Sequence, residues 1–325
     1  MLRTSPCYNR VVAVTALYRY PVKSMLGEQL QRFRLDDLGV VGDRTHAVLD
    51  VETGTVASAK VPRLWGDLLS FSARCAGEPE RGAAPLVEIT FPDGSVHHSG
   101  DDDVDDALSS ALGRSVRLID TPPEGAAFEE LWPDIDGLAP DAVIAGTRVR
   151  EEETGEVVSR FDLAAMAPRP AFVDLAVLHV LTSATLDRLR ELAPGVTFDE
   201  RRYRPNVVLG AAGAGFAENS WCGRTIAFAG GARVSVTIPT MRCVMTTLPQ
   251  GDLPRDADTL RTVAKHNRVD IPGLGTWACA GVYADVVRQG ELVVGETFEL
   301  SGPADGPGPG PGSRTPGAGG TTVAG

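Results

Sequence analysis

Short apolar segments separated by turn residues dominate the first third of the chain. Apolar and polar residues alternate within them, as in half-buried β-strands, and Gly, Pro or Asp residues follow them. The pattern predicts strands at residues 11–18, 29–35, 45–50, 68–74 and 86–91. Their spacing is typical of a small β-barrel. A helix is expected at residues 101–112, because carboxylates lie at its start and Gly113 follows it.

The second half of the chain is mixed, with strands in the majority. Strands are predicted at residues 173–181, 206–209, 225–229, 234–238, 281–288 and 297–300, and helices at 182–192 and 256–266. Residues 121–169 are rich in Pro, Gly and acidic residues without a sustained period, which indicates a linker or an ordered excursion.

The patterns together predict a mixed α/β, β-dominant protein. We expect an N-terminal β-barrel domain at residues 1–120, the linker or excursion at 121–169 and a second β-barrel domain with a few helices at 170–302. Residues 303–325 form a Pro/Gly-rich tail whose composition predicts disorder.

Composition narrows the class of protein. The chain has 325 residues, 43% of them hydrophobic, and a net charge of −12, which argues against binding nucleic acid or an anionic membrane. An anionic ligand would therefore need a locally basic pocket. No segment resembles a signal peptide or a membrane span, and the five cysteines are sparse and form no C-x-x-C pair. We expect a cytoplasmic protein.

Cys243 is the first candidate for chemistry. It follows Arg242 where an apolar strand meets a polar turn, and a neighbouring cation favours the thiolate form that binds soft metals. A buried structural cysteine is the alternative, and the local sequence does not decide between them.

Basic and hydroxyl side chains supply a candidate anion pocket. Lys23 and Ser24 end a Y-P-V-K-S run, Arg44 ends G-D-R, and Arg204 and Asn206 belong to R-P-N, where Pro205 predicts an extended Arg204. Solvated surface charges explain each cation equally well when it is taken alone.

Thr182 and Ser183 stand at a predicted helix start, where free backbone amides attract phosphate. Ordinary helix capping explains them too. The five histidines are scattered and predict no metal site, and no nucleotide-binding glycine motif is present.

In this order, the motifs Y-P-V-K-S, G-D-R, R-P-N and R-C-V-M-T-T resemble the MOSC family, with its N-terminal MOSC β-barrel domain followed by a MOSC domain. The resemblance extends over about residues 11–300 and includes the mitochondrial amidoxime-reducing component and its bacterial relatives. It implies that Cys243 is the molybdenum ligand and the catalytic residue. It also implies that a molybdenum cofactor, molybdopterin with its metal, contacts Lys23, Ser24, Arg44, Thr182, Ser183, Arg204, Asn206 and Arg242.

The same resemblance implies an oxidoreductase that reduces N-hydroxylated or related small molecules. Two departures bear on the substrate: Ser183 replaces the Asp usual in amidoxime reducers, and Leu248-Pro249-Gln250 replaces the usual V-D-P. The tail has no cysteine, so we expect no intrinsic iron–sulfur cluster and a separate electron donor such as a ferredoxin. The alternatives are a sulfur relay through Cys243 and a carrier of the cofactor without catalysis.

Overall fold

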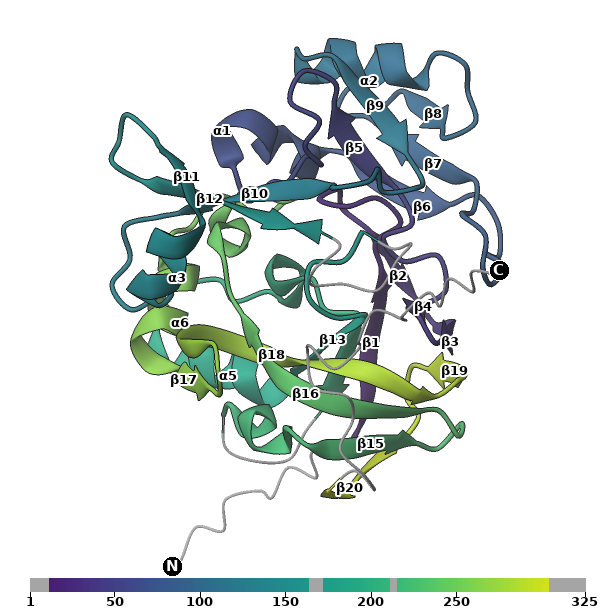
Figure 1. Ribbon diagram of the computed structural model, residues 1–325. Coiled ribbons are helices and arrows are strands. Elements are labelled where there is room, and N and C mark those ends of the chain that lie inside the picture. Colours follow the sequence, from purple (N-terminus) through teal and green to yellow (C-terminus); the bar gives the residue numbers. More distant parts are fainter. Residues whose placement is uncertain (1–11, 164–171, 211–214, 304–325) are drawn as a thin grey trace, which may run out of the picture.

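One large mixed sheet joins the two ends of the chain. The computed structural model describes residues 12–163, 172–210 and 215–303 (Figure 1). The sheet has nine strands in the order β2-β1-β14-β13-β18-β16-β15-β20, with β17 paired to β18. Its strands are β1 (Ala13–Arg19), β2 (Glu28–Leu30), β13 (Leu178–Thr182), β14 (Val207–Gly210), β15 (Arg224–Phe228), β16 (Arg233–Met241), β17 (Arg268–Ile271), β18 (Gly275–Arg288) and β20 (Phe298–Pro303).

Smaller sheets complete the β structure. One contains β3 (Arg32–Asp36), β4 (Gly39–Val40) and β19 (Gly290–Val293), and a second pairs β5 (Ala47–Asp50) with β9 (Val116–Ile119). A third contains β6 (Ser72–Cys75), β7 (Val87–Thr90) and β8 (Val96–His98), and a fourth β10 (Ala127–Trp132), β11 (Arg148–Glu151) and β12 (Val157–Asp162). In Figure 1 the sheets of residues 47–162 lie above the large sheet, and β1 runs from one region into the other.

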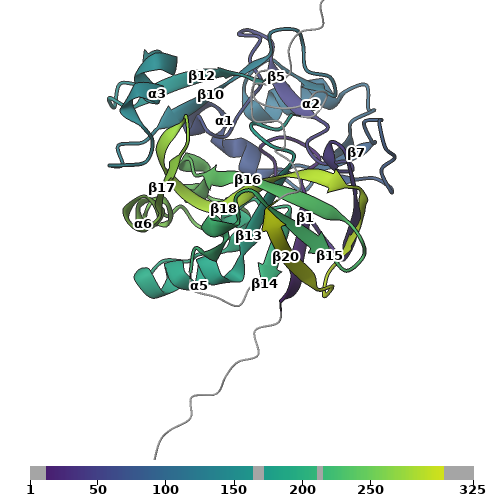
Figure 2. The same ribbon diagram turned by 60° about the horizontal axis from the view of Figure 1, so that its bottom comes forward.

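Helices are short and cover the edges of the sheets. The α-helices are α1 (Pro62–Trp65), α2 (Val104–Leu112), α3 (Asp141–Thr147), α5 (Ser183–Leu192) and α6 (Asp258–His266), and the 3-10 helices are η1 (Gly66–Ser70), η2 (Glu200–Tyr203), η3 (Ala217–Trp221) and η4 (Val244–Thr247). Figure 2 shows α5 and α6 on the same side of the large sheet. Leu186 and Leu189 of α5 pack with Leu260 and Val263 of α6 in one buried cluster.

The core of the large sheet depends on β1. This strand pairs antiparallel with β14, with Leu17 opposite Val207, and both side chains belong to the main core cluster. A separate buried cluster around Leu68, Phe71 and Ile89 fills the N-terminal region. The N-terminal strand is therefore part of the C-terminal core.

The β-dominant fold predicted from the sequence is confirmed, with local corrections. The predicted strand 29–35 is two strands, β2 and β3. The start of the predicted strand 68–74 is wrong, because Leu68 and Leu69 lie in η1. Both side chains are buried, which a strand with one solvent-exposed face does not allow for neighbouring residues.

The segment 121–169 is more regular than its sequence indicated. It holds the sheet β10-β12-β11 and α3. In β10, Ala127, Phe128, Leu131 and Trp132 are all buried, so the strand shows no alternation that a sequence pattern could reveal.

The domain boundaries stay a prediction, although the large sheet crosses them through β1 and β2. The predicted tail, 303–325, lies outside the described residues except for Pro303, the last residue of β20. No helix of the described ranges is both long and apolar enough to span a membrane.

Asn206 connects three strands of the large sheet. Its side chain accepts from the His179 N–H (3.2 Å) and donates to the Tyr18 carbonyl (3.3 Å), and it is 1% exposed. We expect Asn206→Ala to lower the free energy of unfolding by about 2 kcal/mol, because both buried backbone groups lose a partner. Urea denaturation measures this. Gln289→Ala, which removes an amide bonded at the surface, is the control, and equal stabilities of the two variants would contradict the assignment.

Candidate functional site

Three of the sequence-predicted site residues have left-handed backbone conformations. Among the described residues, Ser24, Arg44, Arg204 and Phe216 are the non-glycine residues with positive φ, at 65°, 48°, 53° and 59°. Such conformations cost free energy and concentrate at ligand sites. The extended backbone predicted for Arg204 is wrong: this residue ends η2 in the left-handed region, with its N–H bonded to the Arg201 carbonyl.

The turn after β1 is tied to the other motif segments by backbone hydrogen bonds. The Arg44 N–H donates to the Tyr20 carbonyl (2.7 Å), and the Lys23 N–H donates to the His46 carbonyl (2.9 Å). The Ser24 hydroxyl accepts from the Ala59 N–H (3.1 Å), which brings the segment before α1 to the same place.

Tyr20 and two arginines form one wall of the site. The guanidinium carbons of Arg44 and Arg204 lie 4.8 and 4.2 Å from the centroid of the Tyr20 ring. Arg44 is neutralised by an ion pair with Asp43. Both terminal nitrogens of Arg204 are buried without a hydrogen-bond partner in the described part of the chain, and so is the Tyr20 hydroxyl. Burial lowers the pKa of Arg204 to about 10, which leaves it cationic at neutral pH.

A second wall consists of two lysines and two carboxylates. Lys60 donates to Glu130 (2.8 Å) and lies 3.0 Å from Asp174, which also accepts from Lys23. Burial opposes ionisation of Asp174, yet Lys23 and Lys60 hold its pKa well below the usual range. Burial also opposes the charge on Lys60, but Asp174 and Glu130 raise its pKa well above the usual value.

Sequence reasoning missed Lys60, Glu130 and Asp174. They belong to none of the four motifs, and Glu130 lies in the segment that lacked a period. In the structure, the ammonium groups of Lys23 and Lys60 both lie within 5.0 Å of the centroid of the buried Phe128 ring. This contact joins segments that are distant in the sequence, so no local sequence signal could have revealed it.

Cys243 lies near the second wall, at the junction of β16 and η4. Its side chain is partly exposed, and it packs at the edge of a small cluster that includes Ala59 and Met245. Burial raises the pKa of the Cys243 thiol, and the charge of Lys60 acts in the opposite direction. Arg242 acts to lower this pKa, in the direction expected from the sequence, but burial outweighs it, and the effect of Lys60 is larger than that of Arg242.

Arg242 is turned toward the interior of the large sheet. Its guanidinium donates to the carbonyls of Tyr203 (2.9 Å) and Thr240 (3.2 Å) and lies 3.5 Å from Nε2 of His179. Burial, followed by the charge of Arg242, keeps the pKa of His179 well below 6.5, so this histidine is neutral.

Tyr283 lies close to the second wall and to the thiol. Burial raises its pKa to about 12, while the charges of Arg242 and Lys60 act to lower it. Asp174 and Cys243 act on the same hydroxyl in the opposite direction.

Thr182, Ser183 and Asn206 have other surroundings. Thr182 caps α5: its hydroxyl accepts from the Thr185 N–H (3.2 Å) and donates to the buried carboxylate of Glu218 (2.7 Å). Ser183 is the first residue of that helix, and the Asn206 amide is bonded within the large sheet. Contact of these three residues with a cofactor stays a prediction.

His97 lies near two exposed acids at the surface. Ligand atoms of His97, Asp101 and Asp103 lie within 4.8 Å of one another, and His97 lies 3.6 Å from Asp103. The absence of a histidine metal site stays a prediction from the sequence.

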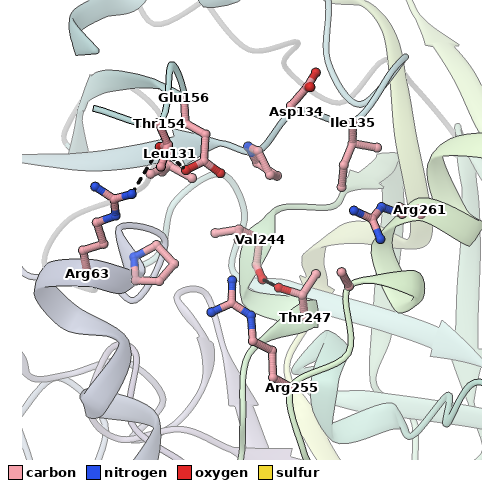
Figure 3. A pocket seen from close by; sticks show the side chains of 13 residues that line it. Arg63, Leu131, Asp134, Ile135, Thr154, Glu156, Val244, Thr247, Arg255 and Arg261 are labelled. Atoms are coloured by element: carbon pink, nitrogen blue, oxygen red, sulfur yellow. Dashed lines mark hydrogen bonds between the residues drawn. The ribbon is translucent and has the colours of Figure 1, made fainter. Parts of the chain in front are cut away.

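A cavity of about 640 Å³ is bounded by Val244, the residue that follows Cys243 (Figure 3). Val244 and Thr247 of η4 line one side, and Leu131 and Ile135 line the opposite side. Its polar boundary includes three arginines, Arg63, Arg255 and Arg261, and two acids, Asp134 and Glu156.

The site residues are thus buried and mostly basic, lie near a thiol, and are brought together where the first strands of the chain join the large mixed sheet. The strand-rich fold and these residues are those of a β-barrel protein with a basic site beside a cysteine. Two family models match the chain: the MOSC N-terminal beta barrel domain at residues 11–72 and the MOSC domain at residues 168–299. The chain belongs to the MOSC domain family, as its motifs indicated. MOSC domains are in general molybdenum cofactor-binding domains and are associated with molybdenum cofactor sulfurase-like proteins.

Two solved structures are similar to the chain. The YuaD protein from Bacillus subtilis is 10% identical, with a TM-score of 0.38, over 89% of this chain and 94% of that one. YiiM from Geobacillus stearothermophilus is 20% identical, with a TM-score of 0.28, over 39% of this chain and 55% of that one. These scores carry no argument about function. The comparison with curated proteins finds no match.

The titration of Cys243 offers a test of the site's electrostatics. Lys60→Met removes the cation that favours the thiolate, so we expect the pKa of Cys243 to rise; Glu130→Gln removes an opposing charge, so we expect it to fall. The measurement is the pH dependence of Cys243 alkylation in cofactor-free protein, followed at that residue by mass spectrometry. Shifts in the same direction for both variants would contradict the geometry.

Proposed function

We propose that this protein binds a molybdenum cofactor between its two walls and uses Cys243 as the thiolate ligand of the metal. The observation that carries the proposal is the guanidinium of Arg204, which is buried with two nitrogens that have no partner. Burying such donors is costly unless a ligand accepts from them. A phosphate oxygen suits a guanidinium because both of its nitrogens can donate to it.

The charges of the site favour the same ligand. In the two walls, Lys23, Arg44, Lys60 and Arg204 carry positive charge, and Asp43, Glu130 and Asp174 carry negative charge. One positive charge remains unbalanced within this group. A phosphate monoester is an anion at neutral pH and would balance it. The chain as a whole has a net charge of −12, so this excess is local.

The residues present therefore fit the cofactor. Arg204 and Arg44 would hold its phosphate over Tyr20, Lys23 and Lys60 would neutralise the remaining negative charge, and Cys243 would hold the metal. When bound, the cofactor supplies two-electron redox chemistry at the metal. Thiolate ligation requires loss of the Cys243 proton, and Lys60 next to the thiol favours that loss.

The proposed reaction is the reduction of an N-hydroxylated small molecule. The N–O bond breaks, two electrons and two protons enter, and the products are the N–H compound and water. A separate one-electron carrier protein, such as a ferredoxin, supplies the electrons.

We assign different roles to the remaining predicted residues. Ser24 positions the turn that carries Lys23 by accepting from Ala59. Asn206 and Arg242 hold the strand ends on which Arg204 and Cys243 stand. Thr182 and Ser183 stabilise the start of α5.

The first experiment combines metal analysis with activity. Protein produced in a host that makes the cofactor should contain molybdenum and pterin in equal amounts and reduce benzamidoxime with reduced methyl viologen as the donor. Cys243→Ala should abolish turnover. Molybdenum without turnover would favour a cofactor carrier, and a persulfide on Cys243 without metal would favour a sulfur relay; either result contradicts the reductase.

Arg204 and Arg202 form a matched pair for the cofactor site. Arg202 is 1% exposed and donates to the carbonyls of Thr246, Leu248 and Pro254. We expect Arg202→Met to lower the free energy of unfolding by roughly 2 to 4 kcal/mol, because three buried carbonyls lose their donor. Arg204→Met should not lower the stability of the cofactor-free protein, because the terminal nitrogens of Arg204 have no partner in the described part of the chain.

Retention of the cofactor tests the role of Arg204 directly. Arg204→Met should lose the pterin during gel filtration, as measured by pterin fluorescence after denaturation. A stable Arg204→Met variant that retains the cofactor as wild type does would contradict the phosphate assignment.

A further inference from the structure

The cavity is bounded by the chain segments that carry Cys243 and two of its charged neighbours, Lys60 and Glu130. Val244, the residue after Cys243, lines it. Lys60 and Glu130 act electrostatically on the thiol, and each lies within two residues of a lining residue, Pro62 or Leu131. The Leu131 N–H donates to the Lys60 carbonyl (2.9 Å), which fixes these segments to each other. A molecule in the cavity therefore contacts the segments that carry Cys243, Lys60 and Glu130.

The inner surface of the cavity is apolar. Leu131 and Val244 are buried side chains, and Ile135 and Pro133 complete this surface. Its volume, about 640 Å³, lies within the range of about 300 to 1,000 Å³ that is common for small-molecule sites. The body of a substrate would therefore contact hydrocarbon here.

The charged groups of the cavity differ in how many hydrogen bonds and ion pairs they make with the rest of the protein. Arg63 donates to Thr154 (3.2 Å) and lies 3.5 Å from Glu152, and Thr154 in turn donates to Glu156 (2.8 Å). These groups on one side of the cavity satisfy one another.

The two arginines on the other side of the cavity have few partners within the protein. Arg261 has an ion pair with Asp258 (3.2 Å), in which both side chains are about 60% exposed, so the pair contributes little. Arg255 has neither a hydrogen bond nor an ion pair within the described part of the chain. In Figure 3 the guanidinium groups of Arg255 and Arg261 point into the cavity, while the carboxylate of Asp134 points away from it.

We propose that this cavity is the substrate site and that the substrate carries a carboxylate, held by Arg255 and Arg261, with its reducible N–O group toward Cys243. The inference rests on the proposed function and names the class of substrate. Planar guanidinium groups bind carboxylates through paired hydrogen bonds, and an apolar inner surface beside them selects a hydrocarbon body with one anionic end. Arg255 has no carboxylate partner within the described part of the chain and is therefore available to an anionic group of the substrate.

Steady-state kinetics of the cofactor-loaded protein test the proposal. Benzamidoxime and 4-carboxybenzamidoxime are compared as substrates with reduced methyl viologen as the donor. We expect kcat/KM to be at least about tenfold higher for the carboxylate, mainly through KM, and this ratio to fall about tenfold in Arg255→Gln/Arg261→Gln. Arg233→Gln, which changes an exposed arginine at the start of β16, is the matched control and should keep the wild-type ratio. Equal kcat/KM values for the two compounds, or a ratio that the double variant does not change, would overturn the inference.

Binding separates this inference from the proposed function. Calorimetric titration with 4-carboxybenzamidoxime requires no turnover. If neither compound is reduced but the carboxylate binds wild type more tightly than the double variant, the reductase proposal fails and the carboxylate site stands. If benzamidoxime is reduced but the carboxylate binds both proteins equally, the reductase stands and the carboxylate site fails.

Discussion

The antiparallel pairing of β1 with β14 is the constraint on which the site depends. Leu17 lies opposite Val207, and the Tyr18 N–H donates to the Asn206 carbonyl. In an antiparallel pair the end of one strand meets the start of the other. Tyr20, just after β1, therefore meets Arg204, just before β14, although 183 residues separate them in the sequence. The guanidinium of Arg204 over the Tyr20 ring is a direct consequence of this register.

The rest of the site is arranged around that contact by three further pairings. The parallel pair of β13 and β14 and the antiparallel pair of β13 and β18 bring His179 and Tyr283 into the same region. The pairing of β16 with β18 places Met241 opposite Cys279, so Cys243 follows two residues later at the end of its strand. Backbone strain at Ser24, Arg44 and Arg204 is the cost of aiming these side chains inward.

Two neighbouring arginines show how differently one residue type can act. Arg202 is buried with its terminal nitrogens bonded to carbonyls around η4, so it holds the segment that carries Cys243. Arg204 is buried with its terminal nitrogens free, so it is prepared for a ligand. The sequence R-R-Y-R does not distinguish them, since the distinction depends on which carbonyls the fold brings within reach.

The sequence by itself determined the β-dominant class, the approximate position of most strands, the helix that ends at Gly113 and the set of motif residues from Lys23 to Cys243. These features are local: alternation, turn residues and short motifs are visible without neighbours from elsewhere in the chain. Only the tertiary structure decided the roles of Lys60, Glu130 and Asp174, the left-handed backbone of Arg204 and the buried strand β10. Each of these depends on burial or on a partner far away in the sequence, and neither burial nor a distant charge leaves a mark on the residues next to it.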